Sequence, residues 1–149
     1  MKAAAVTVEE VNALFAAQLP FCAEMNIRCD HLRSDVGVTR FRYDHRWTRP
    51  GDIVNGGTLM ALADVAVYVA IFTRTGIVPL AVTNELKMNF LRPAIGHDVL
   101  AKATLHKLGR RIAYASVELA EDHDPERLVA HATASYVLPD TARQGGPRR

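Results

Sequence analysis

The longest apolar stretch of the chain lies in its middle, between Gly56 and Phe72. Its apolar residues cover nearly every face of a helix instead of one stripe. Asn55 before the stretch and Gly76 after it are residue types that commonly begin and end helices. The pattern therefore predicts a helix from about residue 55 to residue 74, enclosed by other parts of the chain.

The segments after this helix have the alternating pattern of strands. In the first of them, apolar Val82, Leu86, Met88 and Phe90 are separated by polar residues, which is typical of a sheet with one buried face. Strands are predicted over residues 82–91, 99–108, 112–121 and 128–138. Alternation over residues 27–43 predicts further strand structure, with a hairpin around residues 34–37.

Short separators rich in Gly, Pro and Asp lie between the later strands, at residues 92–96, 109–110 and 122–125. They predict turns between neighbouring antiparallel strands, with no parallel crossover. Near the start, Thr7 and Glu10 form a capping-box pattern for an amphipathic helix that ends before Pro20. The fold class is therefore α+β, with one antiparallel sheet around one long helix. We expect one domain over residues 1–138 and a disordered tail over residues 139–149.

The composition of the chain fits a single soluble domain and disfavours a nucleic-acid-binding function. The chain has 149 residues, of which 49% are hydrophobic and 23% are charged, and this fits one soluble domain with its own core. The formal charge is only +2 and most basic residues are scattered, so we expect no nucleic-acid partner. Cys22 and Cys29 have no partner motif and are interpreted as reduced thiols.

Two features predict a cytoplasmic protein with no membrane partner. The apolar run at the start of the sequence is too short for the apolar region of a secretory signal. The apolar run over residues 56–72 is shorter than the roughly 20 residues that a membrane span needs, and it carries Asp64 near its centre.

Asp64 is the only residue between Gly56 and Phe72 that is charged at neutral pH. Burying an unpaired charge costs several kcal/mol, so this carboxylate must be neutralised, paired or held for a purpose. We interpret Asp64 as the leading catalytic candidate. The alternative is a structural carboxylate that is paired across an interface.

The sequence Asn55-Gly56-Gly57 lies at the start of the long helix, where backbone N–H groups are free and the helix dipole is positive. Glycine lets a ligand approach the backbone closely. Such a site could polarise a carbonyl and stabilise the oxyanion that forms on attack. For Asn55, simple N-capping is an equally good explanation.

Asp64 follows Gly56 by eight residues, which is roughly 12 Å along a helix axis. Within one chain the two residues are therefore too far apart to serve the same carbonyl. Two antiparallel helices related by a two-fold axis would bring Gly56 of one chain near Asp64 of the other. If this is an active site, the sequence predicts a dimer.

Three stretches together resemble the hotdog-fold acyl-CoA thioesterases of the phenylacetic-acid-degradation (PaaI-like) type. They are residues 54–64, with Asn-Gly-Gly and Asp64, residues 81–93, ending in Leu-Arg-Pro, and Gly109-Arg110-Arg111. The resemblance covers about residues 20–138. It implies a hotdog fold, dimers that commonly form tetramers, and an acyl-CoA thioester bound at the dimer interface. The products would be a free acid and CoA, with no cofactor beyond the CoA of the substrate.

The resemblance also implies roles for individual residues. The Gly56 amide would hold the thioester oxygen, and Asp64 of the partner subunit would attack the carbonyl or activate a water. Asn55 stands where the family usually has His, and it cannot carry a proton. Tyr68 stands about one turn after the acid, where the family often has Thr or Ser, and Arg49 stands where members often have Asn or Gln.

Further residues are candidates for substrate binding. The phosphates of CoA need cationic partners, whereas charges at a turn are usually only solvated. The candidates are Gly57, Arg49, Tyr68, Asn89, Arg92, Arg110 and Arg111. The histidines show no metal-ligand spacing, so no metal site is expected. The acyl group stays open between aromatic, medium-chain and short branched types.

The alternative function is a non-catalytic module that binds acyl-CoA or an acyl-carrier protein, with Asn55 marking the loss of turnover. A hydratase or dehydratase on the same fold lacks support, because those enzymes resemble a different Asp/His motif that is absent here.

Overall fold

The computed structural model describes residues 2–140. Their helices and strands, in chain order, are α1 (Val8–Gln18), α2 (Pro20–Glu24), β1 (Ile27–Arg33), β2 (Val36–Phe41), the 3-10 turn η1 (His45–Trp47), β3 (Thr48–Arg49), β4 (Ile53–Val54), α3 (Gly56–Thr75), β5 (Val82–Phe90), β6 (Val99–Leu108), β7 (Ile112–Glu121) and β8 (Leu128–Val137). The tail predicted over residues 139–149 lies outside the described residues from residue 141 onward.

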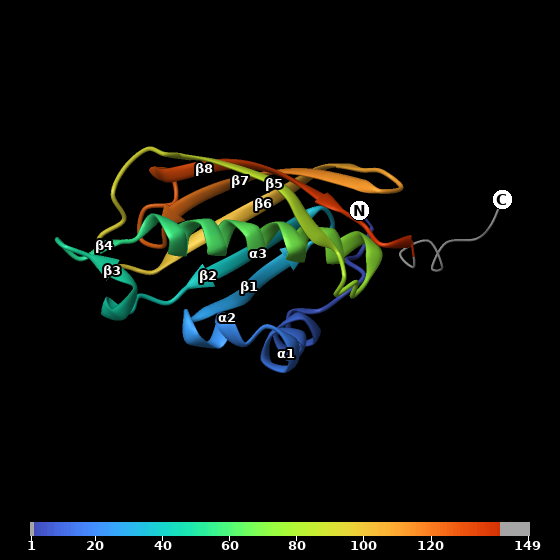
Figure 1. The fold of residues 1–149 in the computed structure, drawn as a ribbon, viewed down its shortest axis with the longest axis horizontal. Helices are drawn as coiled ribbons and strands as arrows, with labels where there is room; N and C mark the ends of the chain where they lie inside the picture. Colours follow the sequence, from blue (N-terminus) through green and yellow to red (C-terminus); the bar gives the residue numbers. More distant parts are fainter. Residues whose placement is uncertain (1, 141–149) are drawn as a thin grey trace.

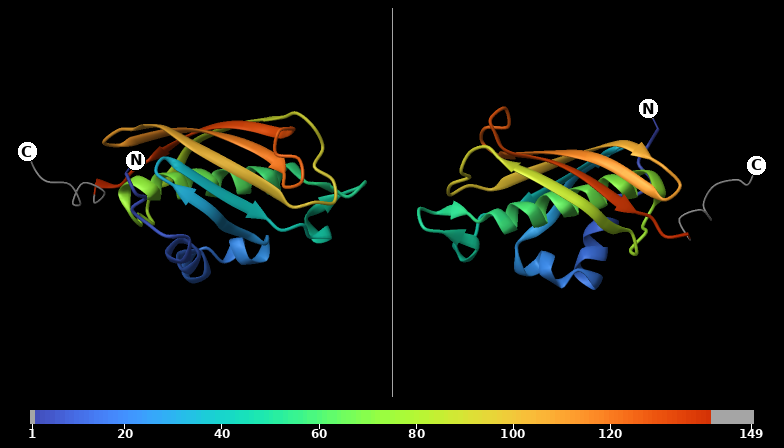
Figure 2. Two further views of the ribbon diagram at one scale, coloured as in Figure 1. Left: turned by 180° about the vertical axis from the view of Figure 1, so that it is seen from behind. Right: turned by 45° about the horizontal axis from the view of Figure 1, so that its top comes forward.

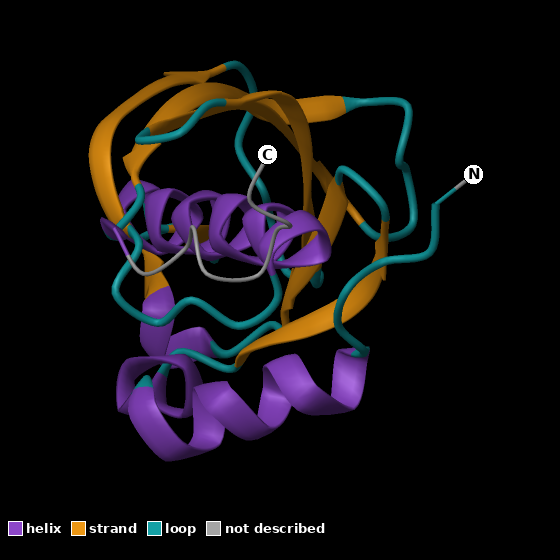
Figure 3. Cartoon of the chain, turned by 90° about the vertical axis from the view of Figure 1, so that its right-hand side faces the viewer, coloured by secondary structure: helices purple, strands orange, loops and turns teal. Residues whose placement is uncertain are grey.

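One six-stranded antiparallel sheet, in the order β1-β2-β6-β7-β8-β5, curves around α3 (Figures 1 and 3). The short β3-β4 pair lies just before α3, and α1 and α2 pack beside β1 (Figure 2). The α+β class and the sheet wrapped around one long helix are confirmed.

The predicted ends of the helices are also confirmed. Thr7 and Glu10 form both hydrogen bonds of the capping box, at 3.2 Å and 2.7 Å. The long helix has Asn55 as its N-cap and Gly76, with φ of 76°, as its C-cap. A left-handed residue at the end of a helix favours glycine, which explains why the helix stops there.

Close approach to the sheet buries most of α3. Gly37 on β2 lies against the helix, where an added Cβ would be 2.6 Å from the backbone nitrogen of Ala70. The Thr39 hydroxyl donates to the Leu62 carbonyl at 3.0 Å.

The helix has 20 residues, so the expectation that it is too short to span a membrane was wrong about length. Instead, 72% of its most apolar window is buried inside the protein, as in a core helix.

The expectation for the first separator was wrong. Residues 92–96 do not form a turn between neighbouring strands, because β5 pairs with β8 and both sides of β6 are occupied by β2 and β7. The segment instead carries the chain from the edge of the sheet to its interior (Figure 1). The other two separators are hairpin turns, as predicted.

The buried face predicted for β5 is also largely wrong. As an edge strand β5 has little cover, and Val82 and Phe90 are 56% and 53% exposed. A bulge between Thr83 and Glu85 shifts the alternation, so Thr83 rather than Val82 reaches α3. The result is an uncovered strip along α3 beside this edge.

Candidate active site

The uncovered strip of α3 consists of residues at helical spacing, namely Gly57, Met60, Ala61 and Asp64, which are exposed or half-buried while most of the helix is buried. A cavity lies at each end of the strip, one beside Gly56 and one beside Asp64. Because α3 is continuous between them, Gly56 and Asp64 stay roughly 12 Å apart along the axis.

Two hydroxyl groups hold the carboxylate of Asp64. Its Oδ1 accepts hydrogen bonds from Thr83 Oγ1 and from the Tyr136 hydroxyl, each at 2.6 Å. The Tyr136 hydroxyl also lies 2.8 Å from the Asp64 carbonyl oxygen. Within residues 2–140, Oδ2 has no hydrogen-bond partner. One oxygen is thus fixed and the other is left for a ligand.

Thr83 and Tyr136 meet at Asp64 because they are paired across β5 and β8. Burial raises the pKa of the Tyr136 phenol, and the nearby charge of Asp64 raises it further. The phenol therefore stays protonated over the whole physiological pH range, and its O–H can donate a hydrogen bond to the carboxylate throughout that range.

The cavity beside Asp64 has a volume of about 490 Å³ and is mostly apolar. Tyr68 forms part of its wall, but its hydroxyl donates to the Pro79 carbonyl at 2.8 Å and its ring packs against Phe72 with centroids 4.2 Å apart. Burial raises the pKa of Tyr68. The hydroxyl of Tyr68 is thus bonded to the backbone, and its ring forms part of the wall. The cavity is lined by Gln18, Leu19, Phe21, Asp64, Val65, Tyr68, Pro79, Ala81, Val82, Thr83 and Tyr136.

At the start of α3, the Asn55 side chain acts as the N-cap. Its Oδ1 accepts from the Thr58 amide at 2.9 Å, and its Nδ2 donates to the Trp47 carbonyl at 3.2 Å. In the described part of the chain, no acceptor pairs with the backbone N–H of Gly56 or of Gly57. The arrangement leaves two amide donors at the positive end of the helix dipole.

Gly56 lies beneath the ring of Phe90, where an added Cβ would be 3.2 Å from Cζ. The cavity here has a volume of about 500 Å³ and contains two arginines. Arg92 donates to the Leu128 carbonyl at 2.8 Å, and Arg49 is exposed. The lining residues are Arg49, Ile53, Val54, Gly56, Leu59, Phe90, Leu91, Arg92, Pro93 and Ala94.

Three candidate residues do not line the cavity beside Gly56 within the chain. Asn89 precedes Phe90 on β5 but is exposed, opposite His131, and lines neither cavity. Arg110 and Arg111 lie in the β6–β7 turn, near the end of the sheet where Thr83 meets Asp64. Arg111 pairs there with Asp140 at 3.0 Å.

The sequence pattern does not reveal the two hydroxyl partners of Asp64. Strict alternation over residues 82–91 places Thr83 on the polar face, because a bulge cannot be seen in the alternation of residue types. Tyr136 offers a usable signal, since the hydroxyl of a buried tyrosine normally needs a partner and Asp64 is the only carboxylate of the long helix.

Comparison with known proteins identifies the family of this chain. The family model of the Thioesterase superfamily matches residues 51–128, which include both ends of the strip. PA0474 of Pseudomonas aeruginosa, a protein provisionally named an esterase, is 36% identical over 104 residues, covering 68% of this chain and 75% of that protein.

Solved structures of similar proteins have the same architecture. A protein of Silicibacter sp. TM1040, provisionally described as a thioesterase, is 31% identical, with a TM-score of 0.82 over 91% of this chain and 94% of its own. A mutant of the phenylacetic acid degradation protein PaaI of Thermus thermophilus is 29% identical, with a TM-score of 0.69 over 80% of this chain and 99% of its own. With its sheet wrapped around α3 and the matching sequence over both ends of the strip, this chain belongs to the thioesterase superfamily and has its hotdog fold.

Proposed function

We propose that this protein is an acyl-CoA thioesterase that works as a homodimer, with each active site shared between two chains. The observation that carries the proposal is the division of the site along the open strip of α3. Free amide donors lie at Gly56, a fixed carboxylate lies at Asp64, and each has its own cavity. One chain holds both groups at a separation that forbids joint action.

Antiparallel packing of two open strips would complete two equal sites. If Gly56 faces Asp64 of the partner subunit, the midpoint residue Met60 faces Met60 of the partner subunit. Met60 is on the strip and is 36% exposed in the single chain, as this arrangement needs. The apolar residues exposed on β5 would also be covered.

The chemistry follows from the two ends of the shared site. The Gly56 N–H donates to the thioester oxygen and stabilises the negative charge that develops there. The free Oδ2 of Asp64 either attacks the carbonyl carbon or removes a proton from an attacking water. The C–S bond then breaks and releases the CoA thiolate. After direct attack, water hydrolyses the mixed anhydride on Asp64, which frees the acid and restores the carboxylate; after attack by water, the proton held by Asp64 passes to the thiolate. A thiol ionises more readily than an alcohol, so its departure needs little acid assistance, which fits the presence of Asn55 instead of a proton carrier.

The walls indicate how acyl-CoA is oriented. The acyl group would lie in the apolar cavity beside Asp64, whereas Arg49 and Arg92 beside Gly56 would face the phosphates of CoA. Arg110 and Arg111 of the partner subunit are on the Asp64 side of the joint site and remain candidates for the same task. Coenzyme A belongs to the substrate, and no separate cofactor is part of the proposal. Assembly into tetramers and a cytoplasmic location belong to the same proposal.

One observation favours a second candidate, the non-catalytic acyl-CoA or acyl-carrier-protein binding module. Asn55 has an amide side chain, which cannot give or take up a proton, and its Oδ1 and Nδ2 already bond to Thr58 and Trp47. The helix start therefore offers no side-chain acid or base. This candidate predicts binding of acyl-CoA without release of thiol.

The test is thiol release from a panel of acyl-CoAs by the wild type and by Asp64→Asn. The substitution keeps the shape of the side chain but removes its charge, so kcat should fall by roughly 10²–10⁴-fold. Thermal unfolding and sedimentation should show that the variant still folds and dimerises. Tight binding without thiol release by the wild type would support the binding module instead.

A matched pair of variants tests the oxyanion donor. Gly56→Pro removes the N–H and adds a ring whose Cβ meets Phe90, and proline is tolerated at the first position of a helix after an extended residue such as Asn55. We expect a loss of roughly 10²–10³-fold in kcat. Gly56→Ala keeps the N–H and adds a Cβ against the exposed ring of Phe90, so its loss should be much smaller. Equal losses in the two variants would argue against the amide.

A further inference from the structure

A cluster outside the proposed active site contains three potential metal ligands. His97, in the segment before β6, meets Asp122 and His123, in the turn after β7. One ligand atom from each side chain lies within 4.8 Å of the others, and all three side chains are accessible from solvent. We propose that these residues bind a zinc ion.

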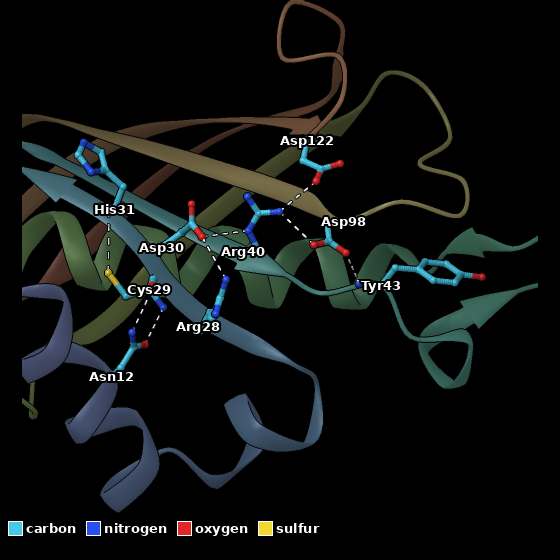
Figure 4. Close-up of polar contacts among 9 residues, drawn as sticks. All are labelled: Asn12, Arg28, Cys29, Asp30, His31, Arg40, Tyr43, Asp98 and Asp122. Atoms are coloured by element: carbon cyan, nitrogen blue, oxygen red, sulfur yellow. Dashed lines mark hydrogen bonds and ion pairs between the residues drawn. The ribbon is translucent and has the colours of Figure 1, made fainter.

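The carboxylate of this cluster is held in place before any ion arrives. Arg40 Nη1 donates to Asp98 Oδ2 at 3.0 Å and to Asp122 Oδ2 at 3.1 Å (Figure 4). The Asp122 amide donates to the Asp98 carbonyl at 3.0 Å. These contacts hold the two segments side by side, while Oδ1 of Asp122 makes no hydrogen bond within the described residues.

The surrounding charge favours a cation. Arg40 contacts Asp30 as well as Asp98 and Asp122, so one guanidinium faces three carboxylates (Figure 4). Arg28 approaches Asp30 only at 3.6 Å, with a side chain that is 65% exposed. Arg42 lines the same hollow as Arg28, Arg40 and Asp98, whereas Glu121 adds a carboxylate beside His123. The carboxylates thus outnumber the arginines by one, and a divalent ion would compensate this charge.

The two imidazoles decide which ion fits. Their ring centroids are 4.0 Å apart, so each ring can present a nitrogen to the same ion after a small side-chain rotation. His123 Nδ1 also lies 3.7 Å from Glu121 Oε2, and ligating histidines often direct their second nitrogen to a carboxylate. Two imidazoles and one carboxylate are a zinc ligand set with one position open, whereas calcium and magnesium prefer oxygen ligands.

Binding would have a structural consequence that does not depend on the proposed function. The segment that ends in His97 begins with Arg92, Pro93 and Ala94, which line the cavity beside Gly56. Ala94 also accepts a hydrogen bond from the Val54 amide at 2.9 Å, directly before the cap of α3. A zinc ion would join this segment to the β7–β8 turn and restrain the wall of that cavity.

The test is a zinc titration of metal-free protein in competition with a chromophoric chelator. The wild type should bind one ion per chain, and His97→Gln combined with His123→Gln should weaken binding by at least about tenfold. His31→Gln, which removes an exposed histidine on β1 outside the cluster, is the matched control and should bind like the wild type. Magnesium should not compete.

Thermal unfolding gives a second readout that is separate from activity. Zinc should raise the Tm of the wild type and of His31→Gln but not that of the double variant, because an ion that binds only the folded state stabilises it. Equal zinc affinity in the wild type and the double variant would overturn the proposal. So would the absence of binding by the wild type at millimolar zinc.

Discussion

The two ends of the open strip on α3 differ in nearly every chemical respect. The end at Gly56 presents free backbone donors, the positive end of a helix dipole and two arginines. The end at Asp64 presents a carboxylate, two hydroxyl groups and an apolar wall. In the proposed reaction each end supplies what the other lacks for attack on a thioester, and a single helix keeps them roughly 12 Å apart.

The two ends also differ in how they are built. The donor end forms locally, from a cap, two glycines and the first turn of a helix. The carboxylate end requires β5 and β8 to place Thr83 and Tyr136 on the same oxygen. A local site tolerates changes elsewhere in the fold, whereas the carboxylate end depends on the register of the sheet edge.

The largest effect should come from mixing two inactive variants. In a mixed dimer of Asp64→Asn and Gly56→Pro, one site carries both defects and the other carries neither. Unfolding and refolding the two together should restore about a quarter of wild-type thiol release, since random pairing makes half of the dimers mixed.

Each variant refolded alone is the control for this experiment and should stay inactive. If the mixture is no more active than its parents although mixed dimers have formed, the site lies within one chain.

Cross-linking tests the register of the two strips without measuring activity. Met60→Cys should be joined to its counterpart in most dimers by a short bifunctional maleimide, because the proposed register places the two residues at the two-fold axis. The native thiols should not interfere, since Cys22 and Cys29 are buried and burial raises the pKa of both to about 12. Electrophoresis under denaturing conditions gives the yield.

His31→Cys, on β1 at the other edge of the sheet, is the control for cross-linking and should give little product. Comparable yields from both variants would contradict the register.

Removing one hydroxyl should affect the carboxylate end alone. Tyr136→Phe leaves Asp64 Oδ1 with Thr83 as its remaining donor, so kcat should fall by about tenfold, the equivalent of one hydrogen bond to a charged group. Stopped-flow thiol release at saturating acyl-CoA measures this change.

Tyr68→Phe is the matched control for Tyr136→Phe. It removes a hydroxyl from the same cavity wall, but this hydroxyl bonds to the Pro79 carbonyl and not to Asp64. An equal loss of kcat in both variants, with similar losses of stability, would mean that Tyr136 only supports the wall.

The smallest effect is expected at the donor end. Arg49→Ala should raise KM for acyl-CoA by several-fold with little change in kcat, because an exposed charge pair contributes at most about 1 kcal/mol. The effect should vanish for a pantetheine thioester, which lacks the nucleotide phosphates. Arg33→Ala, at an exposed arginine on β1, is the control, and an equal rise in KM there would indicate a non-specific charge effect.

The sequence determined the local features of this protein. The cap at Asn55, the end of the helix at Gly76, the capping box at Thr7 and the later hairpins each depend on residues that are close in the chain. The free amide donors at Gly56 also arise from residues that are close in the chain. Asp64 could be recognised as a candidate functional residue without any structure, because it is the one carboxylate in an apolar run.

Only the tertiary structure decided what lies around these features. The pairing of β5 with β8, the bulge beside Thr83 and the hydroxyl of Tyr136 on Asp64 involve residues up to 72 positions apart. The alternation of residue types predicts which side chains of a strand share a face. It does not predict which strands pair with it, or which face each side chain takes after a bulge. Strand order is set by which packing buries the most apolar surface around α3, and this is a property of the whole chain.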